Sequence, residues 1–234
     1  EPLGPESPIE PESPAPYVMT VDELPAGYVP PVELTEVWSA VKAIADTGKY
    51  PPAVMFLGPS GCGKTRAGQY LAESEGLPFT KVDAAAMVDP ESWFGTREIR
   101  SEDGVSITDY HPSSFALAIQ QPGVLLVDEV NRAKDEDRNI FLPLFDATGV
   151  VTNPLTGEKV TRHRKCFIIL SGNRGLQFTG TYAVDPALTT RSLVVEFGYL
   201  DQVTESLVAQ RDTGVDPETA DLFARLASDT RVRA

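Results

Sequence analysis

The residues most able to do chemistry in this 234-residue sequence lie in one short run, Gly58–Thr65, which reads GPSGCGKT. The run fits the pattern G-x-x-x-x-G-K-[ST], in which glycines let the main chain wrap closely around phosphate oxygens. Lys64 is expected to reach the β- and γ-phosphates of a nucleotide, and the Thr65 hydroxyl to bind Mg²⁺. The predicted nucleotide site comprises Gly58, Pro59, Ser60, Gly61, Cys62, Gly63, Lys64, Thr65 and Arg66.

A glycine-rich turn can match this pattern by chance. Here the apolar run Ala53–Leu57 precedes the loop and is typical of a buried strand, and a helical pattern over 64–74 follows it. A loop between a strand and a helix is the context in which the pattern binds phosphate, so this interpretation is favoured.

A second acidic site follows the apolar run Val124–Val127, which ends in Asp128 and Glu129. Carboxylates at the end of a buried parallel strand lie where ligands of α/β sheets bind. Asp128 is expected to hold Mg²⁺ through its water shell, and Glu129 to orient and activate an attacking water. The alternative is a solvated acidic turn. Because Glu129 directly follows the magnesium aspartate, we expect water to be the phosphoryl acceptor.

Short apolar segments alternate with helical patterns along the chain, which predicts an α/β fold with a parallel sheet covered on both faces. The predicted strands are 53–57, 78–83, 124–127, 167–170 and 193–197, and the predicted helices are 34–47, 64–74, 113–120 and 135–146. Two segments break the alternation and predict hairpins, at 97–110 with a turn at Asp103-Gly104 and at 150–165 with a turn near 153–157.

The two ends of the chain differ from this pattern. Residues 1–32 are rich in Pro and Glu, which predicts an extended leader without a core of its own. Two helical stretches, 201–211 and 217–228, predict the beginning of a helical lid over 199–234, leaving 33–198 as the main domain. We also expect the sequence to be a piece of a longer protein, because it begins at Glu1 rather than Met.

Composition narrows the partners. A net charge of −14 and a pI near 4.5 make nonspecific nucleic-acid or membrane binding by the whole surface unfavourable. Cys62 and Cys166 are the only cysteines, which excludes a disulfide framework and suits a reducing cytosol. The sequence has no apolar run of the ~20 residues that a membrane span needs. We therefore expect a cytoplasmic protein.

In these ordered motifs the sequence from about Val29 to Gly198 resembles the AAA+ superfamily, and especially its MoxR-like branch in the helix-2-insert clade with dynein-related proteins. The run Asp128–Ala133 (DEVNRA) is similar to the acidic motif of that branch, and Phe167–Asn173 (FIILSGN) to its sensor-1 strand. Gly180-Thr181-Tyr182 and Asp185–Arg191 resemble the stretch that carries the arginine finger. The two hairpins fall where this branch carries insertions.

The resemblance implies a P-loop NTPase with a three-layer αβα core, two β-hairpin insertions and a partial helical lid, which binds ATP and Mg²⁺. It implies that Asn173 contacts the γ-phosphate or the attacking water, although an Asn can also cap a turn. It implies that Arg191 acts on ATP bound to the next subunit of a homo-oligomeric ring, usually a hexamer, although a surface salt bridge is the alternative. Tyr28-Val29-Pro30 lies where relatives place residues beside adenine.

The sequence departs from the family pattern in places. Ser192 follows Arg191 where a Phe is common, and Arg174 follows Asn173 where many relatives have Pro. The lid contains no clear match to a sensor-2 arginine, for which Arg231 and Arg233 are only positional guesses.

Three functions follow from these features. The first is a ring ATPase that remodels a protein client, with which the resemblance associates proteins bearing a von Willebrand factor A domain. The second is a nucleic-acid motor subunit, and the third is a scaffold that binds nucleotide without hydrolysing it. A basic island could grip an acidic peptide or a nucleic acid, or be a solvated hairpin face. It comprises Lys159, Arg162, His163, Arg164 and Lys165, with Arg97 and Arg100 added from the first hairpin.

Overall fold

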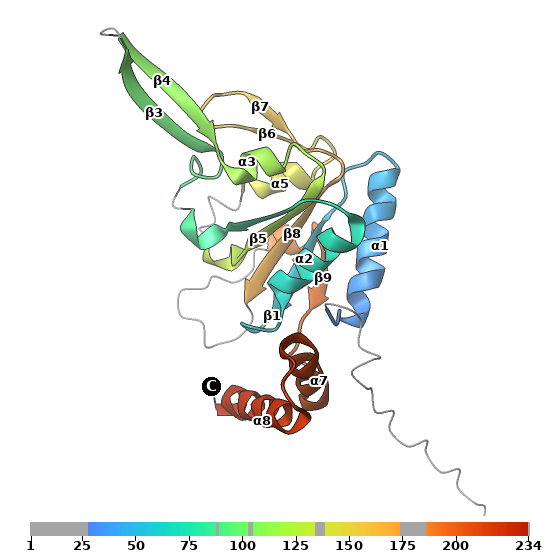
Figure 1. Cartoon of the computed structure of the whole chain (residues 1–234). Helices are drawn as coiled ribbons and strands as arrows, with labels where there is room; N and C mark the ends of the chain where they lie inside the picture. The colour runs from blue at the N-terminus through green and yellow to red at the C-terminus, as the bar shows by residue number, and fades with distance from the viewer. Residues whose placement is uncertain (1–27, 88, 103–104, 134–138, 174–185, 234) are drawn as a thin grey trace, which may run out of the picture. The chain divides into compact units, whose positions relative to one another are not determined.

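Five of the predicted strands pair into one parallel sheet in the computed structural model of the chain (Figure 1). The structure describes residues 28–87, 89–102, 105–133, 139–173 and 186–233. The spatial order of the strands is β2-β5-β8-β1-β9. Their bounds are β1 Ala53–Gly58, β2 Phe79–Asp83, β5 Gly123–Asp128, β8 Cys166–Asn173 and β9 Ser192–Glu196. The predicted α/β class with a parallel sheet is confirmed.

The register of the sheet brings the carboxyl ends of three strands to one edge. Gly58 pairs with Asn173 across β1 and β8, and Val127 pairs with Leu170 across β5 and β8. Asp128, the next residue of β5, therefore lies at the same edge as Gly58 and Asn173. The residues that the sequence predicted for nucleotide chemistry are brought together by this register.

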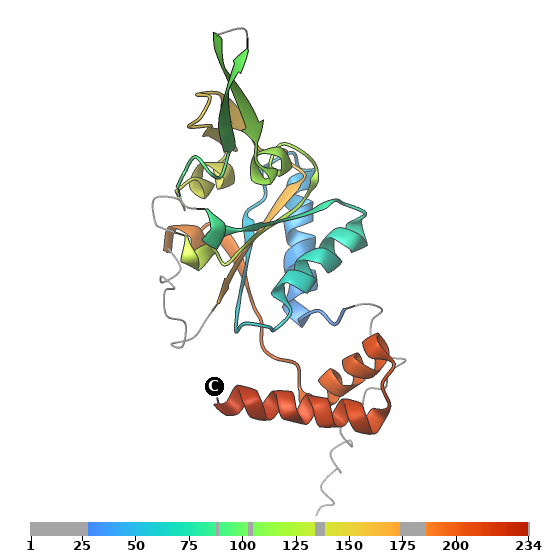
Figure 2. The same ribbon diagram turned by 60° about the vertical axis from the view of Figure 1, so that its left-hand side comes forward.

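Helices cover both faces of the sheet because apolar side chains alternate between the faces. Val54 and Phe56 of β1 share a core cluster with residues of α1 (Val32–Asp46) and α2 (Lys64–Glu75), which lie together on one side of the sheet (Figure 2). Met55 of β1 belongs to a second cluster that includes residues of α3 (Ser114–Ala118) and α5 (Phe141–Phe145). Neighbouring residues of one strand thus anchor two helical layers.

Two helices are shorter in the structure than the sequence predicted. The segment 113–120 forms α3 over only Ser114–Ala118, with the Ser113 hydroxyl accepting a hydrogen bond from the Ala116 N–H as a cap. Of the predicted helix 135–146, residues 135–138 lie outside the described part, and the remainder contains the short α5.

Both predicted hairpins are present. The first consists of β3 (Gly95–Glu102) and β4 (Val105–Pro112), which is longer than predicted and projects away from the sheet (Figure 1). Its predicted turn at 103–104 lies outside the described residues. The second consists of β6 (Val150–Thr152) and β7 (Lys159–Thr161). The side chains of Tyr110 and Asn153 join them, because the Asn153 amide donates to the Tyr110 hydroxyl over 2.9 Å.

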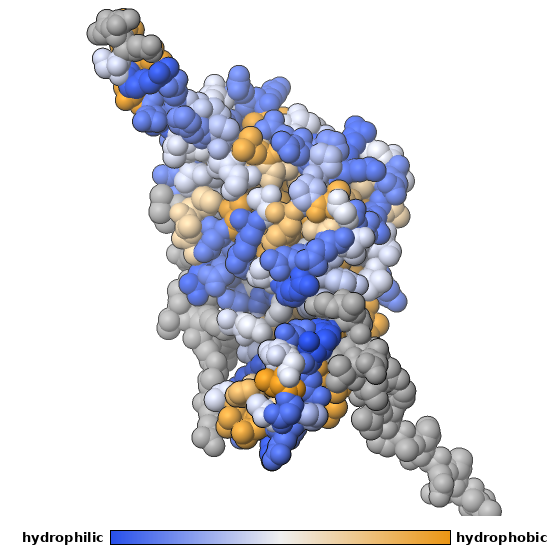
Figure 3. All heavy atoms as spheres, in the orientation of Figure 1, coloured by the Kyte–Doolittle hydropathy of each residue, from blue (hydrophilic) through white to orange (hydrophobic). Residues whose placement is uncertain are grey.

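The outer part of the first hairpin presents apolar side chains to solvent. Ile99 is 74% exposed and Val105 is 63% exposed, among the mainly hydrophilic residues of the hairpin (Figure 3). Arg100, which the sequence assigned to a basic island, instead forms an ion pair across the hairpin with Asp109, with 2.6 Å between Nε and Oδ2.

The prediction that Arg162 belongs to an exposed basic island is wrong. Its side chain is only 1% exposed, and its guanidinium donates hydrogen bonds to the main-chain oxygens of Pro51, Leu144 and Cys166 at 2.7–3.1 Å. Burial lowers the pKa of Arg162 to about 10. Nearby, the Arg164 guanidinium lies 5.6 Å from the centre of the Tyr50 ring. The basic residues that adjoin one another in the sequence therefore have different roles. Arg162 is buried and joins separate segments of main chain through hydrogen bonds, whereas Arg164 is exposed at the surface.

Replacing Arg162 with Met should lower the free energy of unfolding by about 2–4 kcal/mol, because the substitution leaves buried carbonyl oxygens without donors. Chemical denaturation followed by circular dichroism measures this change. Arg164→Met is the matched control, since that neighbouring arginine is exposed, and it should shift stability by less than ~0.5 kcal/mol. Equal effects of the two substitutions would contradict the tether assignment.

The C-terminal residues Asp201–Ala234 belong to a different compact unit from residues Ala26–Leu200. The C-terminal residues form α7 (Gln202–Thr213) and α8 (Pro217–Arg233). Asp201 caps α7 by accepting the Thr204 N–H, and Arg231 of α8 forms a two-pronged ion pair with Glu205 of α7. Arg231, which the sequence analysis named by position alone for a sensor-2 arginine, is therefore paired with Glu205 of the same unit. The side chain of Arg233 lies outside the description.

Candidate functional site

The loop Gly58–Lys64 joins the end of β1 to the beginning of α2, and its backbone requires glycine at defined points. Gly61 has φ +76° and Gly63 has φ +90°, which are left-handed conformations that other residues adopt at a cost. A Cβ atom on Gly58 would lie 2.4 Å from the Phe197 carbonyl oxygen. The spacing of glycines in the sequence pattern is therefore explained by both conformation and close packing.

A cavity of about 350 Å³ opens between this loop and the carboxyl ends of β5 and β8. It is lined by predicted site residues from all three elements: Ser60, Gly61, Gly63, Lys64, Thr65, Arg66, Asp128, Glu129 and Asn173. Three predicted binding residues, Gly58, Pro59 and Cys62, belong to the loop but do not line the cavity.

Lys64 connects the loop to β8. Its side chain is 7% exposed, and its ammonium group donates to the carbonyl oxygens of Gly58 at 3.0 Å and Pro59 at 2.7 Å. A further hydrogen bond of 3.0 Å reaches Oδ1 of Asn173. The positive charge is therefore fixed at the wall of the cavity, where it can meet a phosphate.

The Asp128 carboxylate is held by four neighbouring groups. Its Oδ2 lies 2.7 Å from the Lys81 ammonium and accepts from the Thr65 hydroxyl at 3.4 Å. Its Oδ1 accepts from the Ser171 hydroxyl and from the Glu129 N–H. Burial raises the pKa of Asp128, but the hydrogen bonds from Lys81 and Ser171 outweigh it, so the pKa lies below its ordinary value. Asp128 is therefore ionised at neutral pH.

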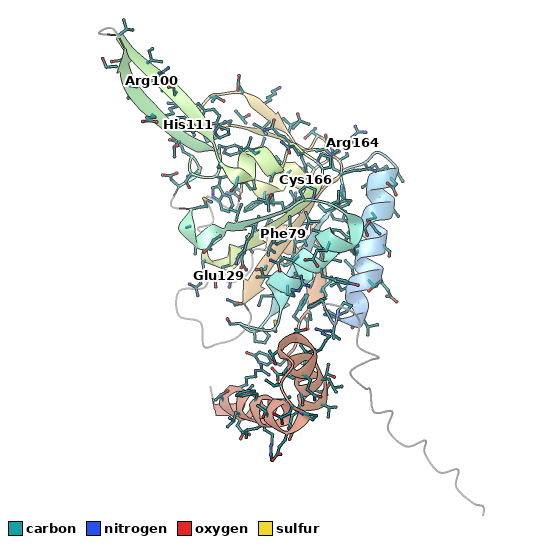
Figure 4. All side chains as sticks on the ribbon, viewed as in Figure 1. Phe79, Arg100, His111, Glu129, Arg164 and Cys166 are labelled. Carbon is teal, nitrogen blue, oxygen red and sulfur yellow. The ribbon has the colours of Figure 1, made fainter. Side chains whose placement is uncertain are left out.

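Glu129 has an unusual backbone. Its φ of +53° is the only positive value among the non-glycine residues of the described chain, a conformation that costs on the order of 1–3 kcal/mol. The turn directs the side chain to the cavity, at the opposite end of the sheet from Arg164 and Cys166 (Figure 4). One carboxylate oxygen accepts from the Asn173 amide at 3.4 Å, and the other lies 3.0 Å from Nε of Arg132.

Asn173 is oriented by a second asparagine that the sequence reading did not assign. The Asn131 side chain, 1% exposed, donates to the Asn173 carbonyl oxygen at 3.2 Å and accepts the Asn173 N–H at 3.4 Å. Asn173 thereby has both ends of its amide directed at site residues, with Oδ1 toward Lys64 and Nδ2 toward Glu129. Held in this way by Asn131, the Asn173 amide can keep the Glu129 carboxylate and the Lys64 ammonium at a fixed separation.

Sequence reasoning also missed Lys81 and Ser171 as parts of the site. Ser171 carried one signal, because a hydroxyl within the apolar strand that leads to Asn173 must find a buried partner. Lys81 carried none, since a lysine near the end of an outer strand is ordinarily a solvated side chain.

Arg191 does not line the cavity of its own chain. Its Nε lies 3.5 Å from the Asp146 carboxylate, one of its terminal nitrogens donates to the Ala187 carbonyl oxygen, and its side chain is 42% exposed. The predicted family motif at 180–185 lies outside the described residues.

Two tyrosines lie beside the phosphate loop. Tyr28 approaches Gly63, where an added Cβ would be 3.7 Å from its ring, and stacks obliquely on Tyr70 with 5.3 Å between ring centres. Burial raises the pKa of the Tyr28 phenol well above its ordinary value. Tyr199 donates its hydroxyl proton to the Ser60 carbonyl oxygen at 2.9 Å. Of the adenine-flanking residues suggested by the resemblance, Tyr28 thus lies next to the loop.

Among the helices in the described part of the chain, none combines the length and the hydropathy that crossing a bilayer requires. The chain is similar in fold to the Thermotoga maritima RuvB Holliday junction branch migration motor, with a TM-score of 0.55 and 13% identity over 88% of this chain and 58% of that one. A RuvB mutant from the same organism gives a TM-score of 0.58.

Sequence relatives include the protein YojN of Bacillus subtilis, which is 26% identical over 182 residues, and a protein of Staphylococcus aureus, which is 25% identical over 197 residues. These matches cover 77% and 83% of this chain. The chain spans 59% of the length of YojN and 73% of the staphylococcal protein.

The model of the AAA domain of the dynein-related subfamily matches residues 53–192, which include the phosphate loop, both acids, Asn173 and Arg191. The match covers more than half of the sequence and includes strands β1, β2, β5 and β8 of the parallel sheet. The chain therefore belongs to the dynein-related subfamily of AAA domains.

Proposed function

We propose that this chain binds ATP with Mg²⁺ and hydrolyses the γ-phosphate at the interface between copies of itself. The observation that carries the proposal is the convergence of Lys64, Thr65, Asp128, Glu129 and Asn173 on one cavity beside a glycine-rich loop. A cation for phosphate, two hard oxygen donors, a carboxylate base and an orienting amide are the groups that phosphoryl transfer to water requires.

The donor set fits magnesium. Asp128 is ionised, and its Oδ2 lies 3.4 Å from the Thr65 hydroxyl, so two hard oxygen ligands face the same region. Mg²⁺ at nucleotide sites is bound by one or two protein oxygens together with phosphate oxygens and water. When bound, the ion would supply charge neutralisation to the phosphates.

Glu129 is the proposed base. It is held between Arg132 and the Asn173 amide, and both contacts leave the carboxylate at the cavity wall. A carboxylate fixed in this way can accept a proton from water as that water attacks phosphorus. Lys64, with Asn173 beside it, would stabilise the negative charge of the phosphate oxygens.

Arg191 supports the oligomeric part of the proposal. It is absent from the cavity of its own chain and partly exposed, and Asp146 fixes its direction. An arginine presented in this way is suited to the ATP of a neighbouring copy, as in a ring. We extend the proposal to the MoxR-like branch, in which the ring would remodel a protein client such as a partner with a von Willebrand factor A domain. Arg162 is buried and Arg100 is paired with Asp109, so the basic island is not one exposed cluster that could bind a nucleic acid. The nucleic-acid motor is therefore the less favoured alternative.

Lys64→Ala tests nucleotide binding directly. The substitution removes charge-assisted hydrogen bonds worth about 1.5–3 kcal/mol each, so the Kd for Mg-ATP should rise about 10- to 100-fold. Isothermal titration calorimetry measures the Kd, and a thermal melt checks folding. Lys42→Ala is the matched control, because Lys42 is half-buried and paired with Glu75 outside the cavity. No binding of Mg-ATP by the unmodified protein would refute the proposed function.

A further inference from the structure

Lys81 is a charged residue at the site for which the proposed hydrolysis gives no role. We propose that Lys81 is a positioning residue that holds Oδ2 of Asp128 and competes with the divalent cation for it. The ammonium would therefore assist the entry of metal-free nucleotide and oppose the binding of Mg²⁺. This inference rests on the proposed function, and its test distinguishes a failure of the role of Lys81 from a failure of the proposed function.

The strand register explains how Lys81 reaches the site. On β2, Lys81 pairs with Leu126 of β5, and Asp83 pairs with Asp128, two positions further toward the carboxyl edge. The long lysine side chain extends along the strand and places its ammonium 2.7 Å from Oδ2 of Asp128. This ion pair joins the outer strand of the sheet to the strand that carries both acids.

The two oxygens of Asp128 have different surroundings. Oδ1 is occupied by the Ser171 hydroxyl and the Glu129 N–H, which are parts of the protein frame. Oδ2 faces the Thr65 hydroxyl, the other predicted magnesium ligand, and it is the oxygen that Lys81 contacts. A hydrated cation between Thr65 and Asp128 would therefore meet the ammonium at the oxygen it needs.

The charges around Lys81 determine whether its removal weakens or strengthens the binding of nucleotide and of Mg²⁺. Asp83, Asp128 and Glu129 are all close enough to interact electrostatically with its ammonium. A triphosphate entering this acidic site is repelled, and a lysine that offsets part of the negative charge reduces the repulsion. The same positive charge repels Mg²⁺ and occupies its ligand. Removing Lys81 should thus weaken metal-free nucleotide binding and strengthen magnesium binding.

A purely structural ion pair would behave differently. The Lys81 side chain is 44% exposed, so a pair that only joined β2 to β5 would have a small effect on stability and none on the balance between nucleotide and metal. Opposite shifts in two binding measurements are therefore the signature of the proposed role.

The test compares Lys81→Met, which removes the charge and keeps the aliphatic length, with Lys81→Arg, which keeps the charge. Lys42→Met is the matched control, since Lys42 also pairs with a carboxylate but lies outside the cavity. The probe is adenylyl imidodiphosphate, an ATP analogue that is not hydrolysed. Calorimetry in EDTA gives its metal-free Kd, and titration with MgCl₂ in the presence of the analogue gives the Mg²⁺ midpoint.

For Lys81→Met, the metal-free Kd should rise about three- to tenfold and the Mg²⁺ midpoint should fall by about the same factor. Lys81→Arg and Lys42→Met should match the unmodified protein in both measurements. If Lys81→Met does not fold, Lys81→Gln is measured in its place. Unchanged values, or shifts of both in the same direction, would overturn the role of Lys81 while leaving the proposed function intact. Failure of the unmodified protein to bind the analogue with Mg²⁺ would overturn both.

Discussion

Glu129→Gln should leave ATP bound and reduce its hydrolysis by about 10²- to 10⁴-fold, the usual contribution of a general base. The amide cannot accept a proton from the attacking water. It keeps a carbonyl oxygen that can accept the Asn173 amide hydrogen bond now made by Oε1 of Glu129, so the geometry of the cavity should persist. Single-turnover release of phosphate measures the rate, and calorimetry with Mg-ATP measures binding.

Two further variants make the result specific to the base. Glu158→Gln changes an exposed carboxylate on the second hairpin and should leave turnover unaltered. Arg132→Leu removes the ion pair that holds Glu129 but keeps the base itself, so a smaller loss of rate is expected. Turnover within a few-fold of the unmodified rate in Glu129→Gln would show that another group activates water.

Arg191→Ala should keep nucleotide binding and lose hydrolysis in the assembled protein by about 10³- to 10⁵-fold, as expected for an arginine that stabilises transition-state charge. Nucleotide binding should be kept because Arg191 does not line the cavity of its own chain. Its guanidinium instead contacts Asp146 and the Ala187 carbonyl oxygen. Steady-state phosphate release above the assembly concentration measures the loss. Arg164→Ala removes another exposed arginine and serves as the control.

Mixing two inactive variants tests whether Arg191 acts on a neighbouring copy. A site formed by the Glu129 of an Arg191→Ala protomer and the Arg191 of a Glu129→Gln protomer contains both groups. Activity should therefore return when the two proteins are combined, although each is inactive alone. An absence of recovery in mixed oligomers that have been shown to form would mean that Arg191 does not act between subunits.

Much of the site was predictable because its signals are local. The loop Gly58–Thr65 is contiguous, and its glycine spacing follows from the left-handed backbone of Gly61 and Gly63. The acids Asp128 and Glu129 directly follow an apolar strand, so their place at the sheet edge follows from the alternation of strands and helices. The parallel sheet was predictable for the same reason.

The hydrogen bonds that complete the site were not predictable, because they join residues far apart in the sequence. Lys64 meets Asn173 across 109 positions, and Thr65 meets Asp128 across 63. The sequence suggested that such residues share a site but not which atoms touch. The Asn131–Asn173 pair and the Lys81–Asp128 ion pair depend on strand order and register, which no local pattern specifies.

The sequence by itself determined the glycine-rich loop, the acidic pair at the end of a strand and the class of sheet, because backbone conformation and hydrophobic periodicity act over a few residues. The tertiary structure alone decided the fate of individual charges. Arg162 and Arg164 are two positions apart, yet one is buried among carbonyl oxygens and the other is exposed. Whether a cation is solvated, buried among carbonyl oxygens or paired with a carboxylate of the candidate site depends on the groups that packing brings around it, and those come from distant strands and helices.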